Sequence, residues 1–141
     1  MKTFDAYLCG YYGMRNSGDD ALMYAAAWGA KKFLNVQNLR ISSQCKLRTP
    51  DFGLQEATQH AKQSFRGQNR LSHYASALRS KRIIFGGGSV LHNAHDIKMK
   101  IDLMALSARK GHMAVGVGLG PFKNQAAEKA CVEFLNRCDF V

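Results

Sequence analysis

The chain has 141 residues, a hydrophobic content of 46%, only two prolines and a formal net charge of +10 at pH 7. This length and composition predict one folded domain over residues 1–141 and exclude a disordered chain. No apolar run is long enough for a transmembrane helix, and the N-terminal segment lacks the apolar core of a signal peptide, so we expect a cytoplasmic protein.

The first elements of the chain surround a glycine-rich turn. Residues 4–9 are predicted to form a strand, and apolar positions recurring every three or four residues predict a helix over residues 19–33. Ser17 is the expected N-cap of this helix, and Asp19 and Asp20 in its first turn suit the helix dipole. In α/β proteins such a first strand-to-helix turn is a favoured place for a ligand.

The remaining elements alternate between strand and helix. Further strands are expected at 38–43, from Arg82 into the turn Gly86–Ser89, at 112–118 and from 138 onward, and helices at 54–64 (short), 70–79, 97–110 and 125–135. The strand at 38–43 is more polar than the others. We therefore expect it to be more exposed and to lie toward an edge of the sheet.

This alternation predicts an α/β fold, with a Rossmann-like parallel sheet of about five strands flanked by helices on both faces. The most apolar strands begin near Phe4, Arg82 and Met113 and should be central, which favours the strand order 2-1-3-4-5. The turns Gly10–Asp19 and Gly86–Ser89 would then face each other where the strand order reverses.

Two glycine motifs were compared with nucleotide-binding signatures. Gly13 and Gly18 have the spacing of a P-loop, but Asp19 and Asp20 stand where Lys and Ser/Thr belong and would repel a triphosphate. Gly116-Val-Gly-Leu-Gly120 resembles part of a dinucleotide fingerprint, but it lies on a late strand without room for the acidic ribose partner. Close backbone packing at a strand end is the alternative interpretation of this second motif.

A metal site is not expected. His92, His95 and Asp96 lie within five residues of one another but lack further ligands at a recognisable spacing, which favours a polar loop. The cysteines form no C-x-x-C pair, so reduced core cysteines are expected. They are Cys9, Cys45, Cys131 and Cys138.

The polar residues best placed to act on a ligand are Asn16 and Asp19. The alternatives are a left-handed turn position for Asn16 and stabilisation of the helix dipole for Asp19. The run Gly86-Gly-Gly-Ser89 would leave backbone amides open to a ligand, or it is a bare turn.

The cations are unevenly distributed. No acid occurs between Glu56 and Asp96, whereas this tract contains Lys62, Arg66, Arg70, Arg79, Lys81 and Arg82. Such a tract favours an anionic partner: a phosphorylated metabolite, a lipid phosphate, a membrane surface or nucleic acid. A solvated helix face explains it equally well.

Three ordered segments carry a resemblance to a known family. They are Gly10-Tyr-Tyr-Gly-x-x-Asn16-x-Gly18-Asp19 with the small-residue helix after it, Gly86-Gly-Gly-Ser89-Val-Leu and Gly116-Val-Gly-Leu-Gly-Pro121. Together they resemble the N-terminal half of the polysaccharide pyruvyl transferase family. Members usually carry an acidic residue soon after the glycine triplet, whereas here Asp96 comes later.

The resemblance implies one lobe of a two-lobed, glycosyltransferase-B-like architecture, with the C-terminal catalytic domain expected outside this chain and the fragment alone inactive. It implies transfer of pyruvate from phosphoenolpyruvate to two hydroxyls of a cell-surface polysaccharide sugar, forming a ketal. Phosphoenolpyruvate is the donor substrate, and no cofactor is expected. Asp19 is the candidate catalytic residue. The candidate substrate-binding residues are Gly13, Asn16, Gly18, Gly86, Gly87, Gly88, Ser89 and Gly118.

Two alternative functions remain open at this point. One is the acceptor lobe of a sugar-nucleotide glycosyltransferase, because the fold does not fix the reaction. The other is a basic domain that binds nucleic acid or a membrane surface, although Phe65 and Tyr74 among the cations match no recognised nucleic-acid motif. The basic tract would also suit a lipid-linked acceptor and a position at the inner face of the membrane.

Overall fold

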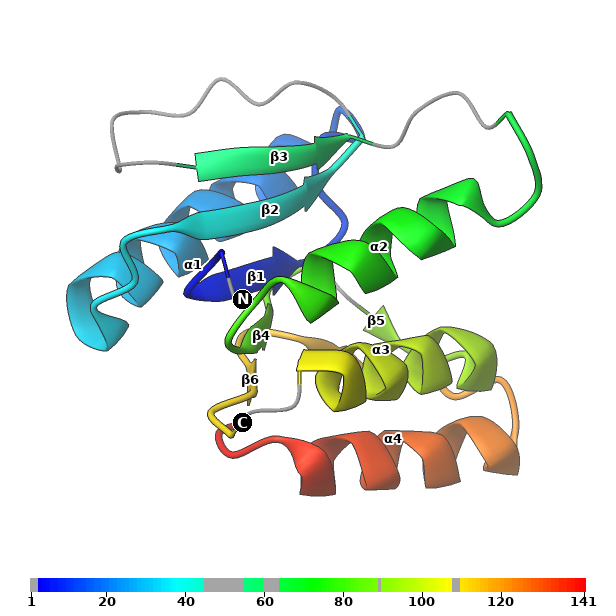
Figure 1. The fold of residues 1–141 in the computed structure, drawn as a ribbon. Helices are drawn as coiled ribbons and strands as arrows, with labels where there is room; N and C mark the ends of the chain where they lie inside the picture. Colours follow the sequence, from blue (N-terminus) through cyan, green and yellow to red (C-terminus); the bar gives the residue numbers. More distant parts are fainter. Residues whose placement is uncertain (1–2, 45–54, 60–63, 89, 108–109) are drawn as a thin grey trace.

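A five-stranded parallel sheet forms the centre of the molecule (Figure 1). The computed structural model describes residues 3–44, 55–59, 64–88, 90–107 and 110–141. The strand order is β3-β2-β1-β4-β6, and all four neighbouring pairs are parallel. The strands are β1 (Ala6–Cys9), β2 (Leu39–Ser43), β3 (Gln55–Gln59), β4 (Ile83–Phe85) and β6 (Met113–Ala114).

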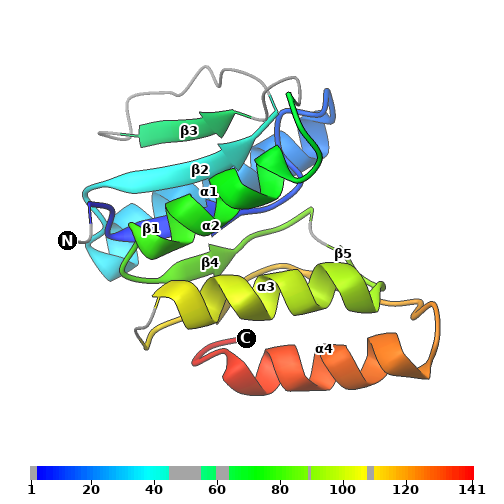
Figure 2. The same cartoon turned by 45° about the vertical axis from the view of Figure 1, so that its right-hand side comes forward.

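Four helices cover the two faces of this sheet unequally. They are α1 (Ser17–Leu34), α2 (Gln68–Leu78), α3 (Ala94–Ser107) and α4 (Gln125–Arg137). In both ribbon views α1 lies on one side of the sheet, and α2, α3 and α4 lie on the other (Figures 1 and 2). The expected α/β fold with helices on both faces is confirmed.

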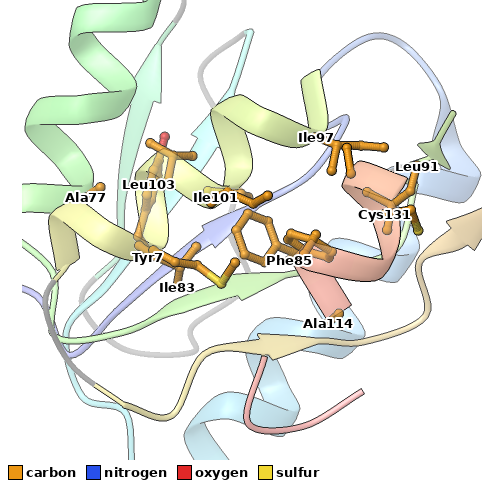
Figure 3. Close-up of a cluster of buried hydrophobic side chains, with 14 residues drawn as sticks. Tyr7, Ala77, Ile83, Phe85, Leu91, Ile97, Ile101, Leu103, Ala114 and Cys131 are labelled. Atoms are coloured by element: carbon orange, nitrogen blue, oxygen red, sulfur yellow. The ribbon is translucent and has the colours of Figure 1, made fainter. Parts of the chain in front are cut away.

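Alternation along the strands builds a separate core on each face. Ala6 and Leu8 of β1 pack with the buried side of α1, whereas Tyr7 and Cys9 belong to the core beneath α2, α3 and α4. Figure 3 shows this second core, in which Phe85 of β4 meets Phe134 of α4 edge-to-face with ring centroids 4.9 Å apart. β1 is therefore buried on both sides, as its apolar sequence predicts.

The predicted strand order is confirmed, and the structure adds one strand to it. β3 occupies 55–59, where a short helix was expected over 54–64, so that prediction is wrong for these residues. Its pairing with β2 removes β2 from the edge and buries it, which corrects the expectation of an exposed second strand. At the opposite edge Phe140 forms a parallel bridge to Met113, where the last strand was expected.

The strand predicted over 112–118 is broken into two pieces. Gly116 has φ = +64°, a conformation that residues with a Cβ rarely adopt, and the chain leaves the main sheet there. Gly118–Leu119 (β7) then pairs in parallel with Val90–Leu91 (β5) as a separate two-stranded sheet. The second and third glycine segments are thus joined by backbone pairing.

Candidate functional site

The first strand-to-helix turn is held by the side chain of Asn16. Asn16 has extended backbone angles and is the N-cap of α1, with its Oδ1 accepting hydrogen bonds from the N–H groups of Gly18 and Asp19. The expected Ser17 cap is wrong, because Ser17 is already the first residue of the helix. The left-handed positions of this turn are Gly13, with φ = +71°, and Arg15, with φ = +61°, and not Asn16.

Both aspartates after the cap are held by this turn. The Nδ2 of Asn16 donates to Asp19 Oδ2 at 2.7 Å, which fixes the Asp19 carboxylate beside the cap. Asp20 Oδ1 accepts from the N–H of Gly13 at 2.9 Å and closes the turn back onto the helix. The two aspartates that exclude a P-loop therefore have a structural role here, because both are hydrogen-bonded within the turn.

The glycine triplet lies directly against this turn and the start of α1. A Cβ on Gly86 would collide with the Tyr12 hydroxyl, and one on Gly87 would lie 2.7 Å from Leu22 Cδ1. A Cβ on Gly88 would lie 2.6 Å from Asp19 Oδ1. The absent side chains thus make room for neighbouring residues, and the two turns meet as the strand order predicted. Ser89 lies outside the described residues.

A cleft of about 690 Å³ opens at the carboxyl ends of β1 and β2. Of the predicted site residues, Asn16, Asp19 and Gly88 line it. Gly13, Gly18, Gly86, Gly87 and Gly118 are not among its described lining residues. Gly87 instead borders an apolar groove beside α1, and Gly118 is paired within β7.

The opposite wall of the cleft comes from α3 and the residues just before it. His92, Asp96 and Lys100 line this wall, with Asp96 in the first turn of α3 and Lys100 four residues later. His95, from the same polar segment, lies instead in a hollow between α3 and α4. The sequence pattern predicts only a polar loop for His92 and Asp96 and makes no prediction for Lys100. Lys100 lies four residues after Asp96, and this spacing could have indicated that the two side chains are neighbours on one helix face.

Burial controls the protonation of the groups inside the cleft. Partial burial lowers the pKa of the Lys100 ammonium, and Asp96 and Cys9 oppose that shift. Burial raises the pKa of the Cys9 thiol to about 12 and also raises the pKa of the Tyr12 phenol. Cys9 is therefore a neutral thiol and a packing residue rather than a nucleophile.

Two tyrosines near the cleft differ in how their hydroxyls are satisfied. Tyr7 Oη lies 2.8 Å from His73 Nδ1 and ties β1 to α2, and His73 itself lines the cleft. Tyr12 Oη is buried and has no hydrogen-bond partner among the described residues. An unpaired buried hydroxyl costs free energy, so Tyr12 is a weak point of this otherwise satisfied turn.

The chemistry available in the cleft is acid–base and polar. Asp19 and Asp96 can accept hydrogen bonds from hydroxyl groups, and Lys100 can bind an anionic group. Within the part of the chain that the structure describes, no three His, Cys, Asp or Glu side chains gather closely enough to hold a metal ion. In the same part, no helix is both long and apolar enough to cross a membrane.

The chain matches a known protein family. The family model described as "Polysaccharide pyruvyl transferase" matches residues 16–141, which includes the α1 cap, the glycine triplet and the α3 wall of the cleft. No curated protein and no solved structure matches the chain.

Proposed function

The chain belongs to the polysaccharide pyruvyl transferase family, and on this premise we propose that its cleft is where a sugar receives pyruvate from phosphoenolpyruvate as a cyclic ketal. The observation that carries the proposal is that Asp19 and Lys100 line the same cleft, so that a carboxylate from α1 and an ammonium from α3 are both available to one ligand. Hydroxyl groups and an anionic donor need these two kinds of group.

The reaction requires two hydroxyls and one enolpyruvyl carbon to meet. Carbon 2 of the donor forms two new C–O bonds, its bond to the phosphate oxygen breaks, and the methylene carbon becomes a methyl group. One hydroxyl proton balances the new methyl C–H bond, and the other leaves with the phosphate. A base close to the sugar hydroxyls is therefore needed, and an acid must protonate the methylene carbon.

Asp19 is the proposed base. Its carboxylate lines the cleft, and the bond from Asn16 Nδ2 holds one oxygen in place. Because Gly88 has no side chain, the Asp19 carboxylate can lie directly beside its backbone without a clash. A fixed carboxylate at the edge of an open cleft can accept a proton from a hydroxyl that binds there.

Lys100 is the proposed contact for a charged group of phosphoenolpyruvate. Among the described residues it makes no ion pair, and it is partly buried in the cleft wall. Asp96 offsets only part of the cost of burying this ammonium, so Lys100 gains from an incoming anion. The donor-binding cations and catalytic histidine implied by the resemblance would face this cleft from the second lobe.

The test uses the full-length gene product, phosphoenolpyruvate and a panel of glycans. Release of phosphate that depends on a glycan, together with the methyl signal of a pyruvate ketal in the proton NMR spectrum, is the expected result. Asp19→Asn should lower kcat by about 10²- to 10⁴-fold, the usual contribution of a general base. Glu128→Gln is the matched control, because Glu128 also lies in the first turn of a helix but outside the cleft.

Two outcomes would decide against this proposal. Turnover of a nucleotide sugar without any turnover of phosphoenolpyruvate would favour the glycosyltransferase alternative. If the wild-type enzyme forms the ketal and Asp19→Asn is fully active, Asp19 is not the general base. The proposed transfer reaction would still stand in that case.

A further inference from the structure

The outer side of α1 carries large apolar side chains in contact with solvent. Leu22, Trp28 and Phe33 are 46%, 45% and 71% exposed, whereas Met23, Ala27 and Ala30 on the inner side pack against the sheet. Exposed apolar side chains are ordinary when scattered, but a contiguous set is typical of a contact surface. The next question is whether these three belong to one surface.

An apolar groove joins them. It has a volume of about 430 Å³ and lies between α1 and the end of the sheet formed by β4 and β6. Leu22, Trp28 and Phe33 line one side, Ile84 and Met113 line the other, and every lining residue is apolar or a glycine. On this face α1 is the only helix in the described part of the chain, whereas three helices cover the opposite face (Figures 1 and 2).

Positive charge borders the exposed rings. Lys31 and Lys32 lie in the last turn of α1, and Lys32 Nζ lies 4.8 Å from the ring centroid of Trp28 and 5.8 Å from that of Phe33. The acidic residues of α1, Asp19 and Asp20, are in its first turn, at the opposite end of the helix. Trp28 and Phe33 pack edge-to-face, with centroids 5.7 Å apart, so they present one continuous aromatic surface.

We propose that this α1 surface, formed by Leu22, Trp28, Lys31, Lys32, Phe33 and the adjoining groove, docks onto the interface of an anionic lipid bilayer. Aromatic rings flanked by lysines are typical of helices that lie in the headgroup region, where the rings bury their apolar area and the ammonium groups contact lipid phosphates. The net charge of +10 favours such a surface. It disfavours a second copy, because two chains would bring their lysines together.

The single tryptophan of the chain makes the test direct, because Trp28 lies within the proposed surface. The protein is mixed at low salt with vesicles of phosphatidylcholine alone or with phosphatidylglycerol. The expected result is sedimentation with the anionic vesicles only, a blue shift of the tryptophan emission, and quenching of that emission by brominated acyl chains. Binding should weaken as salt is added.

Two pairs of variants separate the proposed surface from overall charge and hydrophobicity. Lys31→Gln with Lys32→Gln should lower the partition coefficient by about 25-fold, since each lysine near an anionic surface contributes about fivefold. Lys98→Gln with Lys129→Gln removes the same charge from exposed positions on α3 and α4 and should have a much smaller effect. Phe33→Ser should weaken binding by about tenfold. Phe65→Ser, at another exposed phenylalanine, should leave binding unchanged.

Three results would overturn the inference. The first is an absence of binding and of any emission change with anionic vesicles at low salt. The second is equal weakening by the α1 variants and their controls, which would indicate attraction by net charge alone. The third is a concentration-dependent dimer in analytical ultracentrifugation that Phe33→Ser dissociates, which would assign the surface to a second copy.

Discussion

Gly88 lies directly beside the Asp19 carboxylate at the edge of the cleft, although the two residues follow different strands of the sheet. Gly88 has φ = +80°, and a Cβ added there would lie 2.6 Å from Asp19 Oδ1. Two independent reasons therefore favour glycine at this position: its positive φ, and the lack of room for a Cβ beside the carboxylate. This contact also links the two turns whose facing was predicted from the strand order.

Gly88→Ala should therefore destabilise the protein by more than backbone strain alone. Gly67 is the matched control, because it has φ = +92° and nothing lies within 4 Å of an added Cβ. We expect a cost of about 1 kcal/mol for Gly67→Ala and of at least about 2 kcal/mol for Gly88→Ala, where crowding adds to strain. Urea denaturation measures both, and equal costs would show that Asp19 moves aside freely.

Asn16 is expected to carry the capping energy of α1. Asn16→Ala should lower the free energy of unfolding by about 1 kcal/mol, because the N–H groups of Gly18 and Asp19 lose their acceptor. Ser17→Ala should change it by less than about 0.5 kcal/mol, as is usual for an exposed position without such a role. Thermal unfolding of the two variants provides the comparison. A larger loss of stability in Ser17→Ala than in Asn16→Ala would indicate that Ser17 is the N-cap.

Tyr12 and Tyr7 should respond in opposite ways to loss of the hydroxyl. Tyr12→Phe should be neutral or stabilise by about 1 kcal/mol, since it removes a buried polar atom without a described partner. Tyr7→Phe should destabilise by about 1 kcal/mol, because its bond to His73 is lost. Urea midpoints at equal m-values provide the comparison. A clear loss in Tyr12→Phe would indicate that its hydroxyl has a partner in solution.

Lys100 should make stability depend on pH in the alkaline range. Burial lowers its pKa in the folded protein below the reference value of 10.5, so between the two values the unfolded chain binds more protons than the folded one. Stability then rises with pH through this window, and the cost of the buried charge is complete below the folded pKa. Lys100→Met should accordingly be more stable than wild type at neutral pH.

The advantage of Lys100→Met should shrink as the pH rises toward 10.5, the unfolded reference value. Urea denaturation at neutral pH and at about pH 10 tests this. In the transfer assay the same variant should raise the KM for phosphoenolpyruvate. A stability difference that stays constant with pH would mean that Lys100 is not desolvated, whatever the assay shows.

Much of the fold follows from local patterns in the sequence. The helical period predicted 19–33, and α1 runs from Ser17 to Leu34, because the buried positions Met23, Ala27 and Ala30 repeat at that period. The polar segment Gln55–Gln59 has no such signal, and it forms a strand because β2 offers a free edge. Pairing with a neighbour is a tertiary contact, so local propensity did not predict it.

The candidate site was predictable on one wall only. Gly88 belongs to a turn, and Asn16 and Asp19 belong to the cap and first turn of a helix, where residue type is tied to position. Lys100 and His73 come from helix faces whose spacing resembles that of any amphipathic helix. Their place in the cleft depends on how α2 and α3 pack on the sheet, which sequence periodicity does not specify.

The two walls of the cleft belong to different layers of the protein. Asp19 lies in the first turn of α1, which packs on one face of the sheet, and Lys100 lies on α3, which packs on the other. A shear of one helical layer relative to the other would therefore change the separation of these two side chains directly. Spin labels on the exposed surfaces of α1 and α3 would report any such displacement as a change in their distance distribution.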